Sequence, residues 1–191
     1  MPSYQIPPAT VTLANGNNAS PNITHSLLFT VNSACSLGAI GFYSPAGASG
    51  LPDQCVLFQV TGQSQVAGTL VTSPSWSGAA ASGWVYEDYA SPVALTVGQS
   101  YLSAVHVGPS APDGYGKTTS FWSSGPGSAG YTIGPATAPN YSANNLQGAV
   151  QSGNSSITYP TTNESGNYFG VSVVLITPSG TRSALVLASY I

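Results

Sequence analysis

Residues 83–107, GWVYEDYASPVALTVGQSYLSAVHV, contain side chains that alternate in character in steps of two. Trp84 and Tyr86 fall on one face of this alternation, which is the period of a half-buried β-strand. Pro92 and Gly98 interrupt the run at positions that suit strand edges and turns. The segment therefore predicts three successive strands joined by short turns.

The rest of the chain repeats this pattern without sustained helical periodicity. Gly38 and Gly41 predict a bulge or a close backbone neighbour in one of the other strands. The YFGVSVVLI run is apolar on both faces and predicts a strand inside the core. Further strands are expected at residues 26–31, 37–43, 55–61, 68–72, 115–122 and 168–176. Short strands separated by regular turn signals predict an all-β protein, an antiparallel β-sandwich of jelly-roll or immunoglobulin-like type.

The 191 residues fit a single domain with its own core. Residues 1–24 are rich in Pro, Asn, Ser and Thr and are expected to form an extended N-terminal arm. Residues 25–178 are expected to form the β-sandwich. Residues 179–191 are expected to form a C-terminal strand or a docking tail.

Charged residues make up only 4% of the chain, against roughly 25% in a typical soluble domain. Its surface must therefore be covered mainly by uncharged polar groups, which suits an extracellular or virion protein. Lys117 and Arg182 are the two cationic side chains, and the net charge is −3, so we expect no nucleic-acid partner. The early apolar runs are too short for a secretory signal of the usual kind or for membrane insertion.

Cys35 and Cys55 flank a candidate hairpin whose tip is the SPAGASGLPD loop. Their spacing permits a cross-strand disulfide, and two separate buried thiols are the alternative.

The chemistry-bearing residues do not suggest a catalytic site. Glu87 and Asp88 are the one adjacent pair of carboxylates, and neighbouring residues on a strand point to opposite faces. A hydrolase would need a second carboxylate from elsewhere in the chain. His25 and His106 are too few for a zinc site, and His106 is expected to be a hydrogen-bonded structural side chain on a strand. We predict no enzyme activity, no catalytic residue, no metal and no cofactor.

Aromatic residues in or near predicted loops give the candidate contact site. Rings at such positions can stack on a sugar or anchor a protein contact. The alternative for each is that its ring covers an end of the sandwich. The candidates for glycan or partner contact are Trp76, Tyr115, Trp122 and Tyr141.

Several short motifs occur in a characteristic order along the chain. They are Gly41-Phe42-Tyr43, Ser82-Gly83-Trp84, Pro92-Val93 with Leu95-Thr96, Gly98 and Tyr101, Gly114-Tyr115, Tyr159-Pro160, and Asn167-Tyr168 with Val171 and Val173. The chain thereby resembles, over residues 27–176, a domain family of unknown function found in secreted and cell-surface proteins of bacteria. The resemblance implies a β-sandwich of the binding or adhesion kind and brings no catalytic residues with it.

Low charge, the absence of an export signal and the short length are also typical of accessory virion proteins of tailed bacteriophages. We therefore expect a non-enzymatic structural protein that decorates the capsid or forms part of the tail surface. Its partners would be virion proteins and copies of itself, with a cell-surface glycan as a further partner. The alternative is a secreted bacterial carbohydrate-binding or adhesion module, located outside the cell or on its surface.

Overall fold

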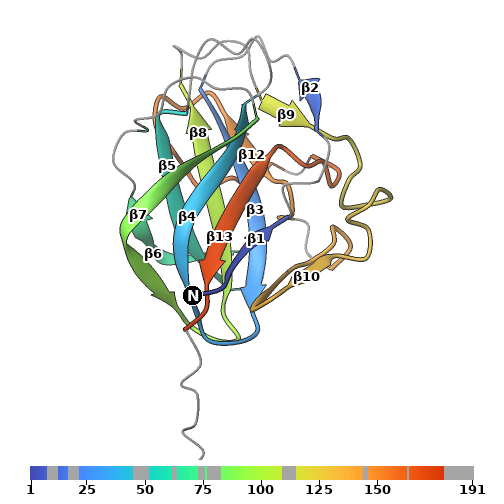
Figure 1. Cartoon of the computed structure of the whole chain (residues 1–191). Helices are drawn as coiled ribbons and strands as arrows, with labels where there is room; N and C mark the ends of the chain where they lie inside the picture. Colours follow the sequence, from blue (N-terminus) through green and yellow to red (C-terminus); the bar gives the residue numbers. More distant parts are fainter. Residues whose placement is uncertain are drawn as a thin grey trace, which may run out of the picture.

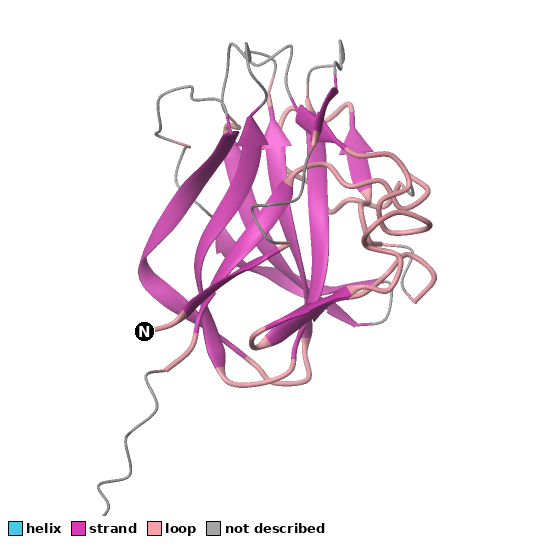
Figure 2. Ribbon diagram, turned by 45° about the vertical axis from the view of Figure 1, so that its right-hand side comes forward, coloured by secondary structure: helices cyan, strands magenta, loops and turns pink. Residues whose placement is uncertain are grey.

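The computed structural model describes residues 1–7, 13–16, 22–44, 52–61, 64–72, 76, 83–108, 115–143, 146–162 and 164–178, with the backbone alone for residues 14–16 and 64–72. Strands and loops make up these ranges, and they contain no helix (Figure 2). Two antiparallel sheets pack face to face, so the prediction of an all-β sandwich is confirmed (Figure 1).

The four-stranded sheet lies in front in Figure 1 and has the order β1-β13-β4-β7. It consists of β1 (Ser3–Ile6), β13 (Val171–Ile176), β4 (Cys35–Ser44) and β7 (Gly83–Leu95). The apolar YFGVSVVLI run supplies β13, which lies between two other strands as predicted.

The seven-stranded sheet lies behind it and has the order β10-β11-β3-β8-β5-β6, with β12 also paired to β3. A separate two-stranded sheet joins β2 (Ala14–Gly16) to β9 (Tyr115–Lys117). The strands of the seven-stranded sheet are β10 (Tyr131–Ile133), β11 (Ala136–Ala138), β3 (Ile23–Val31), β8 (Ser100–Val107), β5 (Gln54–Thr61), β6 (Ser64–Thr72) and β12 (Val150–Ser152).

The main core lies between the two sheets, where every second side chain of each strand points inward. Leu27 and Phe29 of β3 and Val171 and Val173 of β13 meet there, fully buried. A second core lies on the other face of the seven-stranded sheet, under the segment that follows β11. It contains Leu28, Val56, Phe58, Val60, Leu102, Ala104, Leu146 and Ala149.

Residues 83–107 form two strands rather than the three expected. β7 runs for 13 residues and includes Pro92. Residues 89–92 have no partner in the register with β4, which shifts between Leu37 and Ala39. Because β7 is an edge strand and bulges here, the missing N–H of proline costs no ladder hydrogen bond.

The predicted N-terminal arm is part of the domain where the structure describes it. Ser3–Ile6 pairs with β13 of its own sheet as β1. Ile6 is fully buried in the main core, and this burial fixes the strand to its own domain. The predicted C-terminal strand or tail at residues 179–191 lies outside the described residues.

The hairpin expected between Cys35 and Cys55 is not formed. Cys35 begins β4 in the four-stranded sheet, whereas Cys55 lies on β5 in the seven-stranded sheet. The two residues are present as buried thiols, without a disulfide. The chain between them crosses from one sheet to the other, which the local strand pattern did not reveal.

Candidate functional site

Three of the four predicted contact aromatics are buried. Trp122 is 1% exposed, and Trp76 and Tyr115 are each 9% exposed. Tyr141 is half-buried and packs against the main core. A ring covered in this way cannot offer its face to a sugar, so the predicted role of Trp122 in stacking is wrong.

Trp122 belongs to an aromatic cluster beside the sandwich. Its ring meets Phe121, Tyr131 and Tyr168 edge to face, at centroid distances of 4.8, 6.0 and 5.8 Å. The strand expected at residues 115–122 ends at Lys117, and the chain then turns so that both Phe121 and Trp122 point inward. The cluster is therefore a structural element that anchors the turns around it.

Partly exposed aromatic rings are found instead on the outer face of the four-stranded sheet, where Trp84 and Tyr43 also pack against the main core. Trp84 and Tyr86 alternate with inward-facing residues along β7, as the sequence predicted. Tyr43 of β4 lies directly opposite Trp84 in the register. The three side chains are half-buried, and Trp84 contacts both tyrosine rings.

The Trp84 and Tyr86 rings lie nearly parallel to each other. Their planes differ by 25°, and their centroids are 6.4 Å apart. A Cβ atom on Gly41 of β4 would lie 2.8 Å from Cε1 and 3.0 Å from Cδ1 of Tyr86. The Tyr86 ring therefore rests on the backbone of β4, and glycine is needed there because any side chain would push the ring away. The close neighbour of Gly41 is thus a side chain rather than the predicted backbone, and the predicted bulge lies at Gly38, where the register with β7 shifts between Leu37 and Ala39.

Gln5 holds the far end of the Tyr86 side chain. The Tyr86 hydroxyl donates a hydrogen bond of 2.7 Å to Oε1 of Gln5 on β1. Burial raises the pKa of the Tyr86 hydroxyl, and the hydrogen bond with Gln5 acts in the opposite direction. Sequence reasoning missed Gln5, because a lone polar residue near the N-terminus carries no signal of what it contacts.

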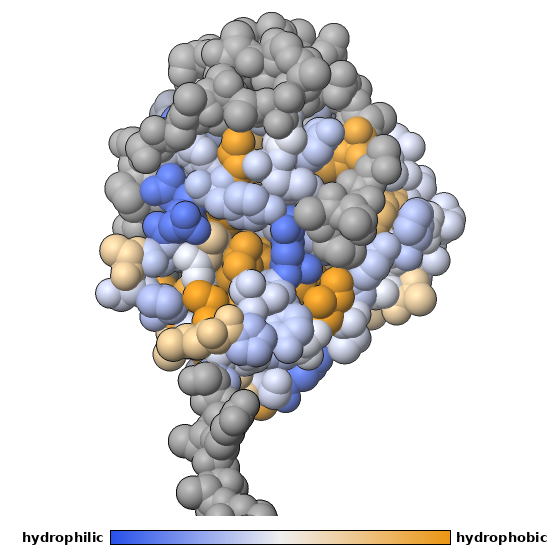
Figure 3. All heavy atoms as spheres, in the orientation of Figure 1, coloured by the Kyte–Doolittle hydropathy of each residue, from blue (hydrophilic) through white to orange (hydrophobic). Residues whose placement is uncertain are grey.

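Polar groups accompany the aromatic rings on this face, which is seen from the front in Figure 3. Ser172 of β13 lies opposite Gly41 and is fully buried, and its hydroxyl has no hydrogen-bond partner. Nε1 of Trp84 and Nε2 of Gln5 are also buried and unpartnered. Asp88 is the one charged side chain among the described residues that point outward from this sheet.

The carboxylates do not converge on a shared site in the described ranges. Glu87 points into the sandwich and is 9% exposed, while Asp88 is exposed on the opposite face. Their opposite orientation was predicted from the strand period. In the part of the chain that the structure describes, no group of three or more His, Cys, Asp or Glu side chains lies together.

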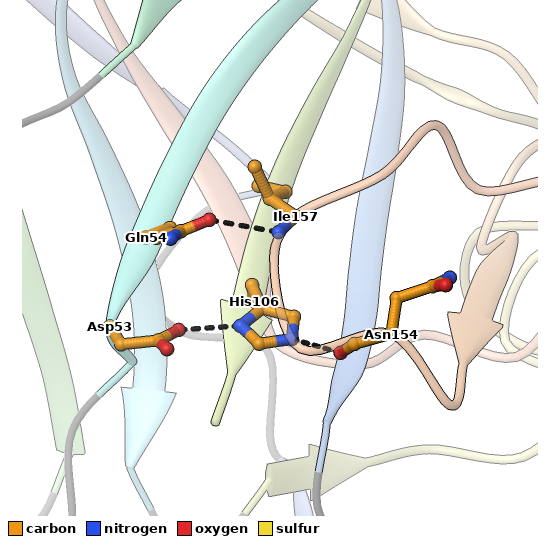
Figure 4. Close-up of polar contacts among 5 residues, drawn as sticks. All are labelled: Asp53, Gln54, His106, Asn154 and Ile157. Carbon is orange, nitrogen blue, oxygen red and sulfur yellow. Dashed lines mark hydrogen bonds and ion pairs between the residues drawn. The ribbon is translucent and has the colours of Figure 1, made fainter. Parts of the chain in front are cut away.

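His106 of β8 is fully buried between two acceptors on the outer face of the seven-stranded sheet (Figure 4). Its Nδ1 lies 2.5 Å from Oδ1 of Asp53, and its Nε2 lies 3.0 Å from the backbone oxygen of Asn154. Next to it, the backbone N–H of Ile157 donates to Oε1 of Gln54 at 2.8 Å. The predicted structural, hydrogen-bonded role of His106 is confirmed.

His25 lies in the main core near the β2–β9 sheet. Its ring stacks on Phe169 at 4.9 Å and approaches Tyr115 at 4.6 Å, and neither ring nitrogen has a hydrogen-bond partner. Burial lowers the pKa of His25 to about 3, and the nearby positive charges of Lys117 and His106 add to the effect. His25 is therefore a neutral core residue at physiological pH.

Gln147 completes the pairing of β3 where two short strands leave a gap. β11 pairs with the C-terminal end of β3, and β12 pairs with its N-terminal end. Between them, Oε1 of Gln147 accepts from the Leu28 N–H at 3.0 Å, and Nε2 donates to the Leu28 carbonyl at 3.0 Å. This fully buried amide therefore takes the place of a paired strand beside Leu28. No sequence motif predicts this role of Gln147.

No helix among the residues that the structure places is long and apolar enough to span a bilayer. The location on a bacteriophage particle stays a prediction.

The comparisons with known proteins give a family and no further relative. No curated protein and no solved structure matches the chain. The model of a domain of unknown function, DUF4082, matches residues 14–170. This range contains β2 to β12 and ends just before β13. The chain therefore belongs to the DUF4082 family of domains of unknown function.

Proposed function

We propose that this chain is a non-catalytic carbohydrate-binding module that holds its ligand on the outer face of the four-stranded sheet. The observation that carries the proposal is the pair of nearly parallel, partly exposed rings of Trp84 and Tyr86, whose planes differ by 25°, with the Tyr86 ring against Gly41. The C–H groups of a pyranose ring carry partial positive charge and pack well on the negative face of an aromatic ring.

The charge of this face supports an uncharged ligand. Asp88 is the one charged side chain on its described part, and no cation accompanies it. An anionic polymer would meet no counter-charge there, whereas a neutral saccharide needs none. Tyr43, Tyr86 and Ser36 bring hydroxyl groups to the same surface for hydrogen bonds with sugar hydroxyls.

The arrangement of the acidic residues supports binding without hydrolysis. Glycoside hydrolysis needs two carboxyl groups that flank one bond. Glu87 and Asp88 are separated by the sheet itself, and Asp53 is bonded to His106. A ligand on the aromatic face would therefore be held without being cleaved.

The test compares Trp84→Ala with Tyr141→Ala on a panel of immobilised neutral polysaccharides. We expect the unmodified protein to bind at least one of them. Loss of a central stacking ring should weaken that binding about tenfold or more, whereas Tyr141→Ala should change it little. Thermal unfolding of both variants shows whether each remains folded.

Three results would contradict the proposal. The first is no binding to any neutral polysaccharide on the panel. The second is equal binding by folded Trp84→Ala protein. The third is stronger loss in Tyr141→Ala than in Trp84→Ala, which would move the site to the loops predicted from the sequence.

A further inference from the structure

The contacts of His106 require more protons than a neutral histidine beside an ionised aspartate supplies. One ring nitrogen faces the carboxylate of Asp53, and the other faces the backbone carbonyl of Asn154 (Figure 4). A carbonyl oxygen only accepts hydrogen bonds, and an ionised carboxylate also only accepts. A neutral imidazole has a single N–H and can satisfy only one of them.

Both contacts form only when the pair carries one proton more than a neutral His106 beside an ionised Asp53. Either His106 is an imidazolium that donates from both nitrogens, or Asp53 is protonated and donates to Nδ1. In both cases Nε2 carries a hydrogen toward Asn154. If the additional proton is lost, two lone pairs face each other at Nδ1 or at Nε2, and that contact becomes repulsive.

The groups that face His106 from the neighbouring strands are uncharged. Thr24 on β3 and Gln54 on β5 lie opposite His106 in the register, and both are uncharged. The second carboxylate oxygen of Asp53 lies against Gly108, 2.5 Å from where a Cβ atom would be. His25 is on the opposite face of the sheet, and its pKa of about 3 keeps it neutral.

The stretch formed by residues 154–159 is attached to the sheet in part through this pair. It contacts the seven-stranded sheet through the Asn154 carbonyl, the Ile157 N–H, and the Tyr159 ring, which packs edge to face on Phe58 at 5.2 Å. Residues 147–152 just before it are held separately, by the Gln147 amide and by β12. The Gly153 N–H donates to the Asn22 carbonyl at 3.0 Å, and Val150 and Thr162 exchange two hydrogen bonds of 2.9 Å, so loss of the Asn154 contact would loosen residues 154–159 alone.

We propose that the fully buried His106 and Asp53, whose side chain is 39% exposed, form a proton site that fastens residues 154–159 to the seven-stranded sheet. The stretch is closed while the pair holds its additional proton, and it opens as the pH rises and the proton leaves. The closed state binds one proton more than the open state, so acid favours closure. Opening uncovers the apolar side chains of Phe58 and Val56 beneath it.

Hydrogen exchange followed by NMR tests the proposal on the whole chain, from about pH 5 to about pH 9. We expect the protection factor of the Ile157 amide to fall with rising pH, by up to about tenfold per pH unit. Amides of β8, such as that of Leu102, should keep their protection and serve as the internal control.

Asp53→Asn is the matched variant. An asparagine side chain donates to Nδ1 without an additional proton, so a neutral His106 can keep Nε2–H on the Asn154 carbonyl. The stretch should then stay closed, and its protection factor should no longer depend on pH. In the unmodified protein, the long-range proton–nitrogen spectrum of His106 should show a hydrogen on Nε2 whenever the stretch is closed.

The proposal is overturned by any of three results. The protection of Ile157 in the unmodified protein could be independent of pH. Folded Asp53→Asn protein could keep the same pH dependence as the unmodified protein. Nε2 of His106 could carry no hydrogen while Ile157 is protected, a result that needs no variant.

Discussion

The hydroxyl of Tyr86 on β7 donates a 2.7 Å hydrogen bond to Oε1 of Gln5 on β1, although two strands lie between them. Each side chain extends along the sheet surface toward the other, over β4 and β13. The contact joins the two edge strands of the four-stranded sheet. It also holds the Tyr86 ring against Gly41, next to Trp84 in the proposed carbohydrate site.

Removing either partner of this bond should destabilise the protein by a similar amount. We expect Tyr86→Phe and Gln5→Ala each to lower the free energy of unfolding by about 0.5–1.5 kcal/mol. Because both remove the same bond, the double variant should cost clearly less than the sum of the two single changes. Denaturant unfolding of the four proteins measures this coupling, and strict additivity would show that the bond contributes nothing.

Replacing Gln147 should be far more costly than replacing its neighbour Gln151. Gln147→Ala leaves the buried N–H and carbonyl of Leu28 without partners, at about 1–3 kcal/mol for each group. Gln151 makes only exposed hydrogen bonds, so Gln151→Ala should change stability by about 0.5 kcal/mol or less. Denaturant unfolding of the two alanine variants makes the comparison, and equal losses would contradict the role given to Gln147.

Acid should destabilise the fold through His25. The pKa of His25 is lowered from 6.5 to about 3 on folding, so between these values the unfolded chain binds more protons than the folded one. Stability from this group is therefore complete above about pH 6.5 and falls by up to about 1.4 kcal/mol per pH unit below it.

His25→Phe should remove this acid sensitivity, because phenylalanine keeps an aromatic ring against Phe169 and Tyr115 without a titrating group. The measurement is the difference in unfolding free energy between the two proteins at about pH 7 and about pH 5. The difference isolates His25, since the Asp53–His106 pair is present in both proteins. A difference that does not change with pH would show that His25 is not buried as a neutral group.

Local patterns predicted which way side chains point, because the direction of successive side chains depends only on the strand period. Trp84 and Tyr86 were placed on one face, Glu87 and Asp88 on opposite faces, and Gly41 next to a close neighbour. The position of β13 between two other strands followed equally from its largely apolar run. These features need no knowledge of what lies on the next strand.

Long-range partners could not be predicted in the same way. The strand pattern predicted that Cys35 and Cys55 flank one hairpin, although their strands belong to different sheets. Trp122 read as a loop aromatic, although the turn after β9 directs it into a cluster with Tyr168. The cost of closing a loop rises only slowly with its length, so distance along the chain is a poor guide to which strands meet.

The sequence by itself determined the all-β class and the facing of side chains along its strands, because a two-residue period is a property of the extended backbone. Only the tertiary structure decided that Gln5 reaches Tyr86, that Gln147 stands in for a strand beside Leu28, and that His106 lies between Asp53 and Asn154. Each of these contacts joins segments far apart in the chain. The residues next to a polar side chain in the sequence do not indicate which distant group will be its hydrogen-bond partner once it is buried.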